Sequence, residues 1–424
     1  MKKLKVLFFL ILLSGTSFSQ VQTSVSIYDC YKNAIEKYPL SKQKKLLKQA
    51  KSISRENINK EYLPKINLNA NASYQSDVIT LPLDIPNVNI PTLSKDRYNF
   101  SFDINQLIYN FGIVEKQKKL DEINYNIKDQ EVEIELFKLK QRINDIFFNI
   151  VLLKEKRKIL ENSIQVIKSK LQAIQSGVEN GLLLNSDANV LKSEILKIEQ
   201  KIIEIDSGIM ASILSLKDLT GIDISYESKL IFPDLSITDI NTQFELRPEF
   251  HLFDLYNHKI DAAKDIISVK NKPNLFGYAS VGYGKPGLDM MSDDFNTFYI
   301  VGLGLSWNIW DWNKYKAQKN ILSLQNKIID TQKETFNKNL SVSLIKNLEE
   351  INKYKALILK DKKIIKLCSD ITKVSSSRLD NGVITSSDYI KDMNEEMQAK
   401  LNFNTHKILL VISKMKYLET IGKF

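Results

Sequence analysis

The chain of 424 residues is poor in the residues that build metal centres, disulfide frameworks and catalytic sites. It has two cysteines, Cys30 and Cys368, and three histidines, His251, His258 and His406. Two cysteines form neither a metal-ligand pattern nor a disulfide framework, although one isolated bridge between them is left open. His251 and His258 could share a metal on one helical face, but exposed helical histidines are far more common. Because no phosphate loop, nucleophile elbow or metal signature occurs either, we expect no enzyme activity and no cofactor.

The chain also lacks a long hydrophobic segment. Residues 1–5 are basic, residues 6–13 are apolar, and small polar residues follow as far as Gln20. This order predicts a signal peptide at residues 1–19, cleaved after Ser19, and therefore an exported protein. Since no later apolar stretch approaches the roughly 20 residues of a spanning helix, the mature chain is either soluble or meets a membrane through strands.

Glycine and proline are scarce, with 14 and 9 residues, whereas 26% of the residues are charged. Together with long stretches of Lys, Glu, Ile, Leu and Asn, this composition favours long helices or coiled coils over a compact sandwich. The formal net charge is +10, but the lysines are spread along the helical stretches. A nucleic-acid site would cluster them, so we expect a solvated helix surface and no nucleic-acid partner.

The sequence contains an internal duplication, which fixes the order of its elements. Pro39 and Pro64 correspond to Pro248 and Pro273, at a constant offset of 209 residues. Later markers recur at an offset of 201 residues: Tyr109 with Trp310, Gly181 with Gly382, Asp187 with Asp388, and Gly221 with Gly422. The first half must therefore contain a longer loop, around Pro82, Pro86 and Pro91.

We expect each half to contain a helix, two strands and a long helical hairpin. The first repeat covers residues 20–221, with strands at about 65–77 and 97–110 and a hairpin at about 113–219. A linker at 222–243 leads to the second repeat at 244–424, with strands at about 274–284 and 297–310 and a hairpin at about 313–420.

The predicted strands have one apolar and one polar face. Apolar residues alternate strictly with polar residues from Ile66 to Gln75 and from Tyr98 to Asn105. In the second half an apolar face of Tyr299, Val301, Leu303, Leu305, Trp307 and Ile309 lies opposite Gly302, Gly304, Ser306 and Asn308. Such alternation predicts strands, and about ten residues cross a bilayer when tilted. A soluble sheet with one wet face would show the same pattern. Aromatic residues where strands pass into helices favour the membrane, because aromatic girdles mark its interface: Tyr109, Phe111, Trp307, Trp310 and Trp312.

Four strands per chain are too few to close a barrel in lipid. The smallest outer-membrane barrels have about eight strands, and an open sheet edge would leave backbone groups unpaired in lipid. Two copies would give eight strands and a largely filled interior, whereas three copies would enclose a water-filled lumen. We therefore expect a homotrimer in contact with outer-membrane lipid.

The long proline-free segment between Gly112 and Pro233 predicts a rod-like helix. About 65 helical residues, at about 1.5 Å each, extend roughly 100 Å. Apolar residues step by three and four from Ile143 to Val178, with Arg157 as one polar interruption, and again from Leu191 to Ile209. This heptad pattern predicts an antiparallel coiled-coil hairpin, and the second half repeats it less regularly.

The turns of the two hairpins are the candidate partner sites. Gly181 and Gly382 can end the first helix, Ser186 can cap the next one, and Asp187 and Asp388 suit its dipole. These structural roles alone would account for the motif. The apolar residues in the turns predict a docking surface, unless they fold back into the hairpin: Leu182, Leu183 and Leu184 in the first turn, and Val383 and Ile384 in the second.

In this combination of features the chain resembles the outer membrane efflux protein family, the TolC-like channels. The resemblance covers nearly all of the mature sequence and rests on four features: the duplication, the proline before the first strand of each half, Arg247-Pro248-Glu249 opening the second half, and the Gly-x5-Asp turns. It implies an α+β membrane protein in which each protomer adds four amphipathic strands to a trimeric 12-stranded β-barrel. The helical hairpins would continue this barrel as a periplasmic tunnel.

The resemblance also implies a function and an arrangement of the turns. The chain would be the outer-membrane channel of a tripartite efflux or type I secretion system, engaged by a periplasmic adaptor (membrane fusion protein) and an inner-membrane transporter. The turns would lie at the periplasmic aperture, with Asp187 and Asp388 near its constriction. Lys391 stands where a second aperture Asp would follow. Our hypothesis is therefore a threefold ring of Asp388 that favours cations and is weakened by Lys391.

A periplasmic adaptor without a pore is the alternative function. Adaptors also present helical hairpins, but they lack duplicated strand pairs of membrane-spanning length. Fractionation separates the two hypotheses.

Overall fold

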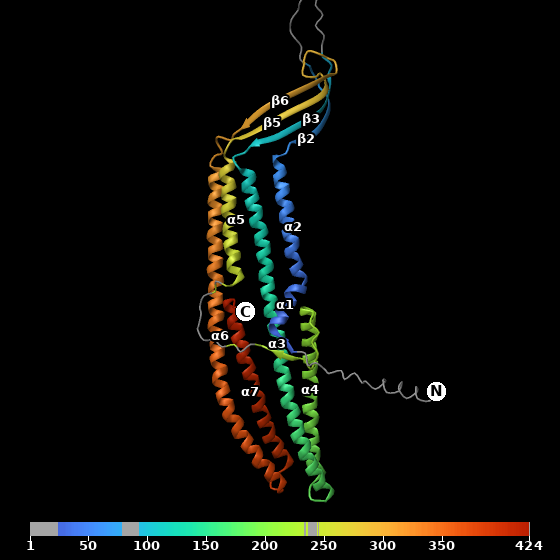
Figure 1. Ribbon diagram of the computed structural model, residues 1–424, viewed down its shortest axis with the longest axis vertical. Coiled ribbons are helices and arrows are strands. Elements are labelled where there is room, and N and C mark those ends of the chain that lie inside the picture. Colours follow the sequence, from blue (N-terminus) through green and yellow to red (C-terminus); the bar gives the residue numbers. More distant parts are fainter. Residues whose placement is uncertain (1–23, 79–92, 233–234, 236–243, 245, 424) are drawn as a thin grey trace, which may run out of the picture. The chain divides into compact units, whose positions relative to one another are not determined.

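The computed structural model describes residues 24–78, 93–232, 235, 244 and 246–423. Three predicted features fall wholly or largely outside these residues: the signal peptide at 1–19, the proline-containing loop of the first half, and the second half of the linker. The described part of the chain consists mainly of long helices and a few strands (Figure 1).

Four helices dominate the fold and form two hairpins of equal dimensions. The helices α3 (Ile113–Glu179) and α6 (Lys314–Asp380) have 67 residues each, and α4 (Asn185–Thr220) and α7 (Ser386–Ile421) have 36 each. In Figure 1, α3 pairs with α4 and α6 with α7. The shorter helices are α1 (Ile27–Lys37), α2 (Pro39–Asn59), η1 (Lys60–Tyr62) and α5 (Pro248–Lys270). Among the described helices, none has both the length and the apolar character needed to cross a membrane.

Four long strands form one antiparallel sheet in the order β2-β3-β5-β6. They are β2 (Lys65–Tyr74), β3 (Asp96–Tyr109), β5 (Asn274–Lys285) and β6 (Asn296–Ser306). Two short strands, β1 (Ser24–Ser26) and β4 (Lys229–Ile231), pair in parallel. Within the described residues, β2 and β6 are the edges of the large sheet. Together with the two hairpins, this sheet confirms the expected α+β fold class.

The passage from strand to helix has the same backbone conformation in both halves. Phe111 and Gly112 precede α3 with φ of 53° and 82°, and Trp312 and Asn313 precede α6 with φ of 55° and 61°. Non-glycine residues rarely adopt positive φ, so this turn is a specific feature that the two halves share. Because β6 ends at Ser306, the segment 307–310 lies outside the strand where strand structure was predicted.

The chain packs as two compact units, and each unit draws on both sequence halves. Unit 1 combines the chain up to Ser41 with Glu135–Leu246 and Leu340–Phe424, and unit 2 combines Lys42–Ile134 with Arg247–Asn339. The equivalent segments of the two halves pair with each other: β3 pairs with β5 in unit 2, and α4 contacts α7 in unit 1. The repeats are therefore not separate folding domains.

The core of unit 1 joins the two hairpins. Ile167 of α3 and Ile198 of α4 are completely buried there, and Met393 of α7 packs with them. The predicted heptad seam is thus confirmed. Its polar interruption, Arg157, donates from Nε to Asp206 of α4 at 2.6 Å. A charged group can lie in such a seam because its partner compensates the lost hydration.

Unit 2 has a smaller helical core beside the sheet. Ile123 and Ile127 of α3 pack against Leu255 and Ala262 of α5. The Arg-Pro-Glu motif begins α5: Arg247 is its N-cap residue, its guanidinium lies 2.5 Å from Glu249, and Phe336 is 5.9 Å away. The motif therefore has a structural role at the start of a helix.

Candidate functional site

One face of the large sheet is apolar and open to solvent in the isolated chain. The strand register places Leu68, Phe102, Val281 and Tyr299 side by side in one row across all four strands. Tyr299 keeps 77% of its surface exposed. An apolar surface of this extent marks a site of interaction with another apolar phase or partner. Its further members include Ile66, Phe100, Tyr283, Val301, Leu303 and Leu305.

The opposite face is divided into a polar and an aromatic half. On β2 and β3 it carries asparagine, serine and Asp103. On β5 and β6, aromatic rings lie over glycines of the neighbouring strand: a Cβ added to Gly302 would lie 2.5 Å from the ring of Tyr278. This aromatic half was not predicted from the sequence, because β5 alternates irregularly. Only the register between β5 and β6 reveals it, because that register pairs each ring with a glycine of the neighbouring strand: Phe276 with Gly304, Tyr278 with Gly302, and Phe298 with Gly282.

Aromatic residues gather at both ends of the strands. The predicted interface residues all lie where strand passes into helix, and all are exposed: Tyr109, Phe111, Trp307, Trp310 and Trp312. Trp307 donates from its indole nitrogen to the carbonyl of Asn271 at 3.2 Å. At the other end of the strands, Phe295 stacks on Tyr98 and Tyr283, with centroid distances of 5.8 and 5.4 Å. Sequence reasoning missed this second group, although aromatic girdles occur at both membrane interfaces.

Both hairpin turns end their first helix in the same way. Gly181 and Gly382 have φ of 74° and 68°. In each turn the following residue donates its N–H back to a helix carbonyl at 2.8 Å, from Leu182 to Gly177 and from Val383 to Arg378. These bonds satisfy carbonyls that would otherwise lack a partner, and the glycine permits the left-handed conformation that they require.

The aspartates of the turns cap the second helix of each hairpin. The carboxylate of Asp388 accepts the backbone N–H of Thr385 at 3.2 Å, and the hydroxyl oxygen of Thr385 accepts the N–H of Asp388 at the same distance. The Thr385 hydroxyl also donates to the carboxylate at 2.7 Å. These hydrogen bonds, and then the charges of Lys391 and Arg378, hold the pKa of Asp388 below its usual value. This proximity makes Lys391 part of the electrostatic surroundings of Asp388.

The first turn forms only half of this cap. Asp187 accepts the N–H of Leu184 at 3.3 Å, but leucine offers no side-chain acceptor in return. The predicted capping role of Ser186 is wrong, because α4 already begins at Asn185 and Leu184 is the N-cap residue. The aspartate three residues beyond the cap satisfies the backbone there, so no hydroxyl is needed before it.

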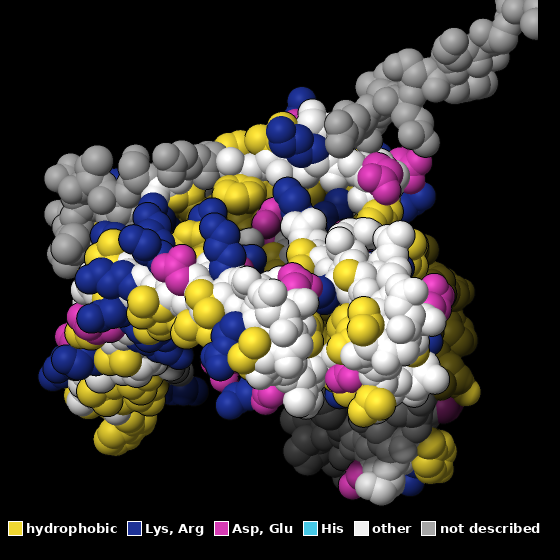
Figure 2. Space-filling model, turned by 90° about the horizontal axis from the view of Figure 1, so that it is seen from below, with side chains coloured by type: hydrophobic (Ala, Val, Ile, Leu, Met, Phe, Trp, Pro, Cys, Tyr) yellow, Lys and Arg dark blue, Asp and Glu magenta, His cyan; other side chains and the backbone are white. Residues whose placement is uncertain are grey.

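The apolar residues of the turns divide into exposed and packed ones. Leu183 and Ile384 fold back against the core of unit 1, and Leu183 covers Gly177. The exposed ones are Leu182, Leu184 and Val383. Figure 2 looks onto the end of the molecule that carries the turns, where hydrophobic side chains appear as small separate patches among polar ones. Folding back into the hairpin is therefore observed for Leu183 and Ile384, and docking stays a prediction for the exposed residues.

Polar contacts tie the two hairpins together near their turns. The ammonium group of Lys170 in α3 lies 2.6 Å from Asp380 and 5.5 Å from the ring centroid of Tyr389. In addition, Asn394 of α7 donates to the buried Glu194 of α4 at 3.0 Å. Neither contact could be predicted, because each joins residues about 200 positions apart that carry no shared motif.

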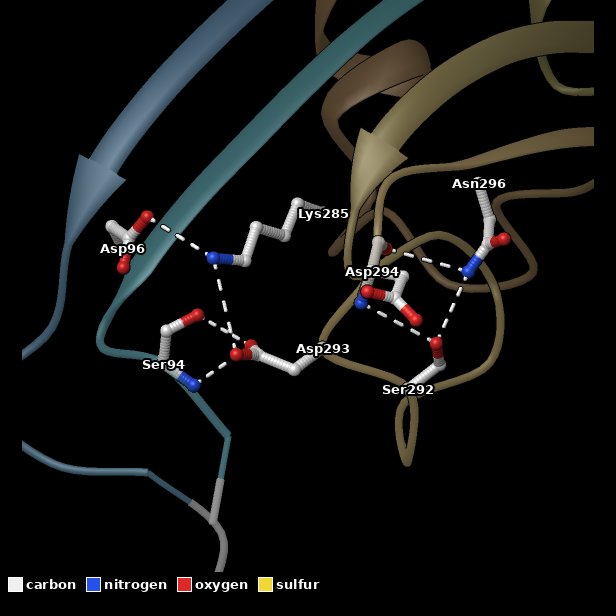
Figure 3. Close-up of polar contacts among 7 residues, drawn as sticks. All are labelled: Ser94, Asp96, Lys285, Ser292, Asp293, Asp294 and Asn296. Atoms are coloured by element: carbon white, nitrogen blue, oxygen red, sulfur yellow. Dashed lines mark hydrogen bonds and ion pairs between the residues drawn. The ribbon is translucent and has the colours of Figure 1, made fainter. Parts of the chain in front are cut away.

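At the far end of the strands, the two strand-connecting loops are joined by a polar latch (Figure 3). The carboxylate of Asp293 accepts hydrogen bonds from the N–H of Ser94, at 2.8 Å, and from its hydroxyl. Lys285 bridges Asp96 and Asp293 at 3.5 and 3.9 Å. The two bonds from Ser94, followed by the charge of Lys285, hold the pKa of Asp293 below its usual value.

The structure also shows the surroundings of the cysteines and histidines. Both thiols are free, so the bridge that the sequence left open is not formed. Burial raises the pKa of the Cys30 thiol to about 12, which leaves it unreactive at neutral pH. His406 pairs with the buried Asp361 at 2.6 Å, and His251 and His258 are exposed on α5. Among the described residues, no group of three such side chains is placed to hold a metal ion.

These elements define the fold of the outer-membrane efflux channels, which confirms the expected resemblance at the level of the fold. The sequence matches no protein-family model and no curated protein. Solved structures do match, over nearly the whole chain. The outer membrane protein VceC from Vibrio cholerae is 12% identical, with a TM-score of 0.68 over 93% of this chain and 96% of that one.

Two further channels agree equally well. CusC, whose structures describe transmembrane channel formation, is 10% identical, with a TM-score of 0.72 over 94% of this chain and 92% of that one. The Campylobacter jejuni outer membrane channel CmeC is 13% identical, with a TM-score of 0.68 over 94% of this chain and 85% of that one. The chain therefore has the architecture of these channels at a low level of sequence identity.

Proposed function

We propose that this chain is the outer-membrane channel of a tripartite efflux or type I secretion system. It would give passive passage from the periplasm to the exterior for substrates that an inner-membrane pump delivers. The observation that carries this proposal is the large sheet. One of its faces is apolar and exposed, the other is polar on β2 and β3 and aromatic on β5 and β6, and within the described residues its edges β2 and β6 are open.

The open edges argue for assembly around a pore. Backbone groups at a sheet edge cannot remain unpaired in lipid, so the β6 edge of one copy needs the β2 edge of the next. Three copies supply twelve strands, which enclose a water-filled lumen, whereas eight strands would leave the interior largely filled. In this arrangement the apolar rows face the lipid, and the aromatic groups at both strand ends lie at the membrane interfaces.

The hairpin turns would form the periplasmic aperture. Asp187 and Asp388 would lie near its constriction, with Lys391 beside Asp388. The turns would also meet the adaptor. Leu182, Leu184 and Val383 offer exposed apolar contacts, whereas Leu183, Ile384 and the two glycines hold the turns in shape.

Fractionation and bilayer recording test the channel function. We expect the protein in the outer-membrane fraction, as a trimer whose gel mobility changes on heating, and we expect purified trimers to conduct ions across planar bilayers. A protein that stays monomeric and soluble without detergent would contradict the proposal and support the pore-less adaptor.

A substitution at the turn tests adaptor docking separately. Leu182→Glu should reduce export and adaptor cross-linking without reducing the amount of trimer, because the side chain is 79% exposed and supports no core. Leu182→Met, which keeps an apolar tip, is the matched control. If Leu182→Glu exports as well as Leu182→Met, this residue does not contribute to docking.

A further inference from the structure

Asp103 occupies a singular position in the large sheet. It lies in the interior of β3, whereas the other charged residues of the four strands are at or next to strand ends: Lys65, Asp96, Arg97 and Lys285. The register places it in one row with Asn67, Ser280 and Ile300, on the face opposite the apolar rows. In the assembled channel this face borders the lumen.

Donors from three strands converge on the Asp103 carboxylate. Ser280 of β5 donates at 2.5 Å and Ser101 of β3 at 3.2 Å, and Asn69 of β2 donates as well. An ionised carboxylate only accepts hydrogen bonds, and several donors together fix its position. The charge is therefore held at one height along the strands, although the side chain is accessible from the lumenal side.

The surroundings of Asp103 strengthen its field. The residue lines a recess of about 630 Å³, to which Leu288 and Met290 of the β5–β6 loop contribute apolar walls together with Phe298 and Ile300. Low-dielectric walls focus the field of a fixed charge into the water beside it. The β5–β6 loop that lines this recess is itself held by the polar latch, through Lys285 and Asp293.

Two cations also line this recess, Arg97 and Lys285. Lys285 is engaged by Asp96 and Asp293. The Cα atoms of Arg97 and Asp103 are six residues apart along β3, or roughly 20 Å at about 3.4 Å per residue. Since the Debye length is about 10 Å at 0.1 M salt, Arg97 and Asp103 act on separate levels of the lumen.

We propose that Asp103 is a specificity-determining residue of the channel, where three copies of this carboxylate favour cations, inorganic and organic, in the membrane-spanning part. The inference rests on the proposed channel function. Asp103 would determine ion selectivity within the sheet, in addition to the selectivity that Asp388 would provide at the hairpin turns.

The test is the reversal potential of reconstituted trimers under a KCl gradient. Asp103→Asn should shift it toward the chloride equilibrium potential, whereas Asp103→Glu, which keeps the charge, should leave it near the parent value. The shift should be larger at about 0.1 M than at about 1 M KCl, where the Debye length falls to about 3 Å. Asp294→Asn removes the same charge outside the strands and serves as the control.

The outcomes separate the inference from the proposed function. An unchanged reversal potential in a conducting Asp103→Asn trimer overturns the role of Asp103 but leaves the channel intact. Parent protein that conducts no ions overturns the channel itself. If Asp103→Asn does not assemble, Ile300→Lys provides the same test, because it adds a positive charge to the row of Asp103 and leaves its three hydrogen bonds in place. That variant must shift the potential in the same direction, and no shift overturns the proposal.

Discussion

The ammonium group of Lys170, near the end of α3, lies 2.6 Å from the carboxylate of Asp380, the last residue of α6. The same group donates to the carbonyl of Ser376 at 3.3 Å. Lys170 thereby joins the first hairpin to the second close to both turns. Any rearrangement that separates the hairpins at this end must break the contact.

Lys170→Met should loosen the turns. The lysine side chain is 10% exposed but Asp380 is 55% exposed, so solvent screening limits the loss to about 1 kcal/mol. We expect faster hydrogen exchange in residues 376–394 and a higher resting conductance of the trimer. Lys168→Met, at an exposed position of the same helix, should change neither measurement. Equal exchange in the two variants would show that the contact does not hold the hairpins together.

Charge substitutions at the second turn should change ion selectivity in opposite directions. Asp388→Asn should shift the reversal potential toward that of chloride, and Lys391→Gln should shift it toward that of potassium, because the two charges oppose each other. Thr385→Ala removes the hydroxyl of the cap but keeps the aspartate charge, so it controls for loss of the cap. Shifts of the same sign for Asp388→Asn and Lys391→Gln would contradict an acidic ring that lysine weakens.

The loop latch should weaken in acid. Hydrogen bonds from Ser94 and the charge of Lys285 lower the pKa of Asp293 in the folded state. A lowered pKa means that the stabilisation is complete above the unfolded value, about 3.9, and is lost as pH falls through the folded value. Limited proteolysis of residues 286–295 should therefore increase in this acidic range.

Asp293→Asn should abolish most of this pH dependence and make the loop more susceptible to cleavage at neutral pH. Asp294→Asn is the matched control, because Ser94 donates to Asp293 and not to Asp294. Proteolysis that is equally pH-dependent in parent and Asp293→Asn would assign the effect to another group.

The glycines beneath the aromatic rings should differ in their tolerance of a methyl group. A Cβ at Gly282 would lie 2.6 Å from the backbone oxygen of Phe100, which cannot move without disturbing β3. The three atoms nearest to a Cβ at Gly302 all belong to the far end of the Tyr278 side chain, which can swing aside. Gly282→Ala should cost about 1–3 kcal/mol, as overpacking does, and Gly302→Ala less. The temperature at which the trimer dissociates on gels measures both, and an equal effect of the two would refute the steric account.

The hairpins and strands could be predicted because their signals are local. A seam of apolar residues at steps of three and four, from Ile143 to Val178, must face another apolar surface. Strict alternation in 66–75 must separate two environments. The irregular strand β5 shows the limit of this reasoning, since Phe276 and Tyr278 find their place only against glycines of β6. The helix start at Asn185 was also missed, because Asp187 and not Ser186 satisfies the backbone there.

The sequence by itself determined the duplication, the lengths of the hairpins and the two-faced character of the strands, because periodicity and spacing state which residues must be buried together. Only the tertiary structure decided which distant residues meet: Lys170 with Asp380, Ser94 with Asp293, and Asn69 and Ser280 with Asp103. Such contacts depend on the register between elements, and a periodic pattern allows several registers that bury the same faces. The polar groups that the structure brings together in the chosen register are therefore those on which selectivity and closure can depend.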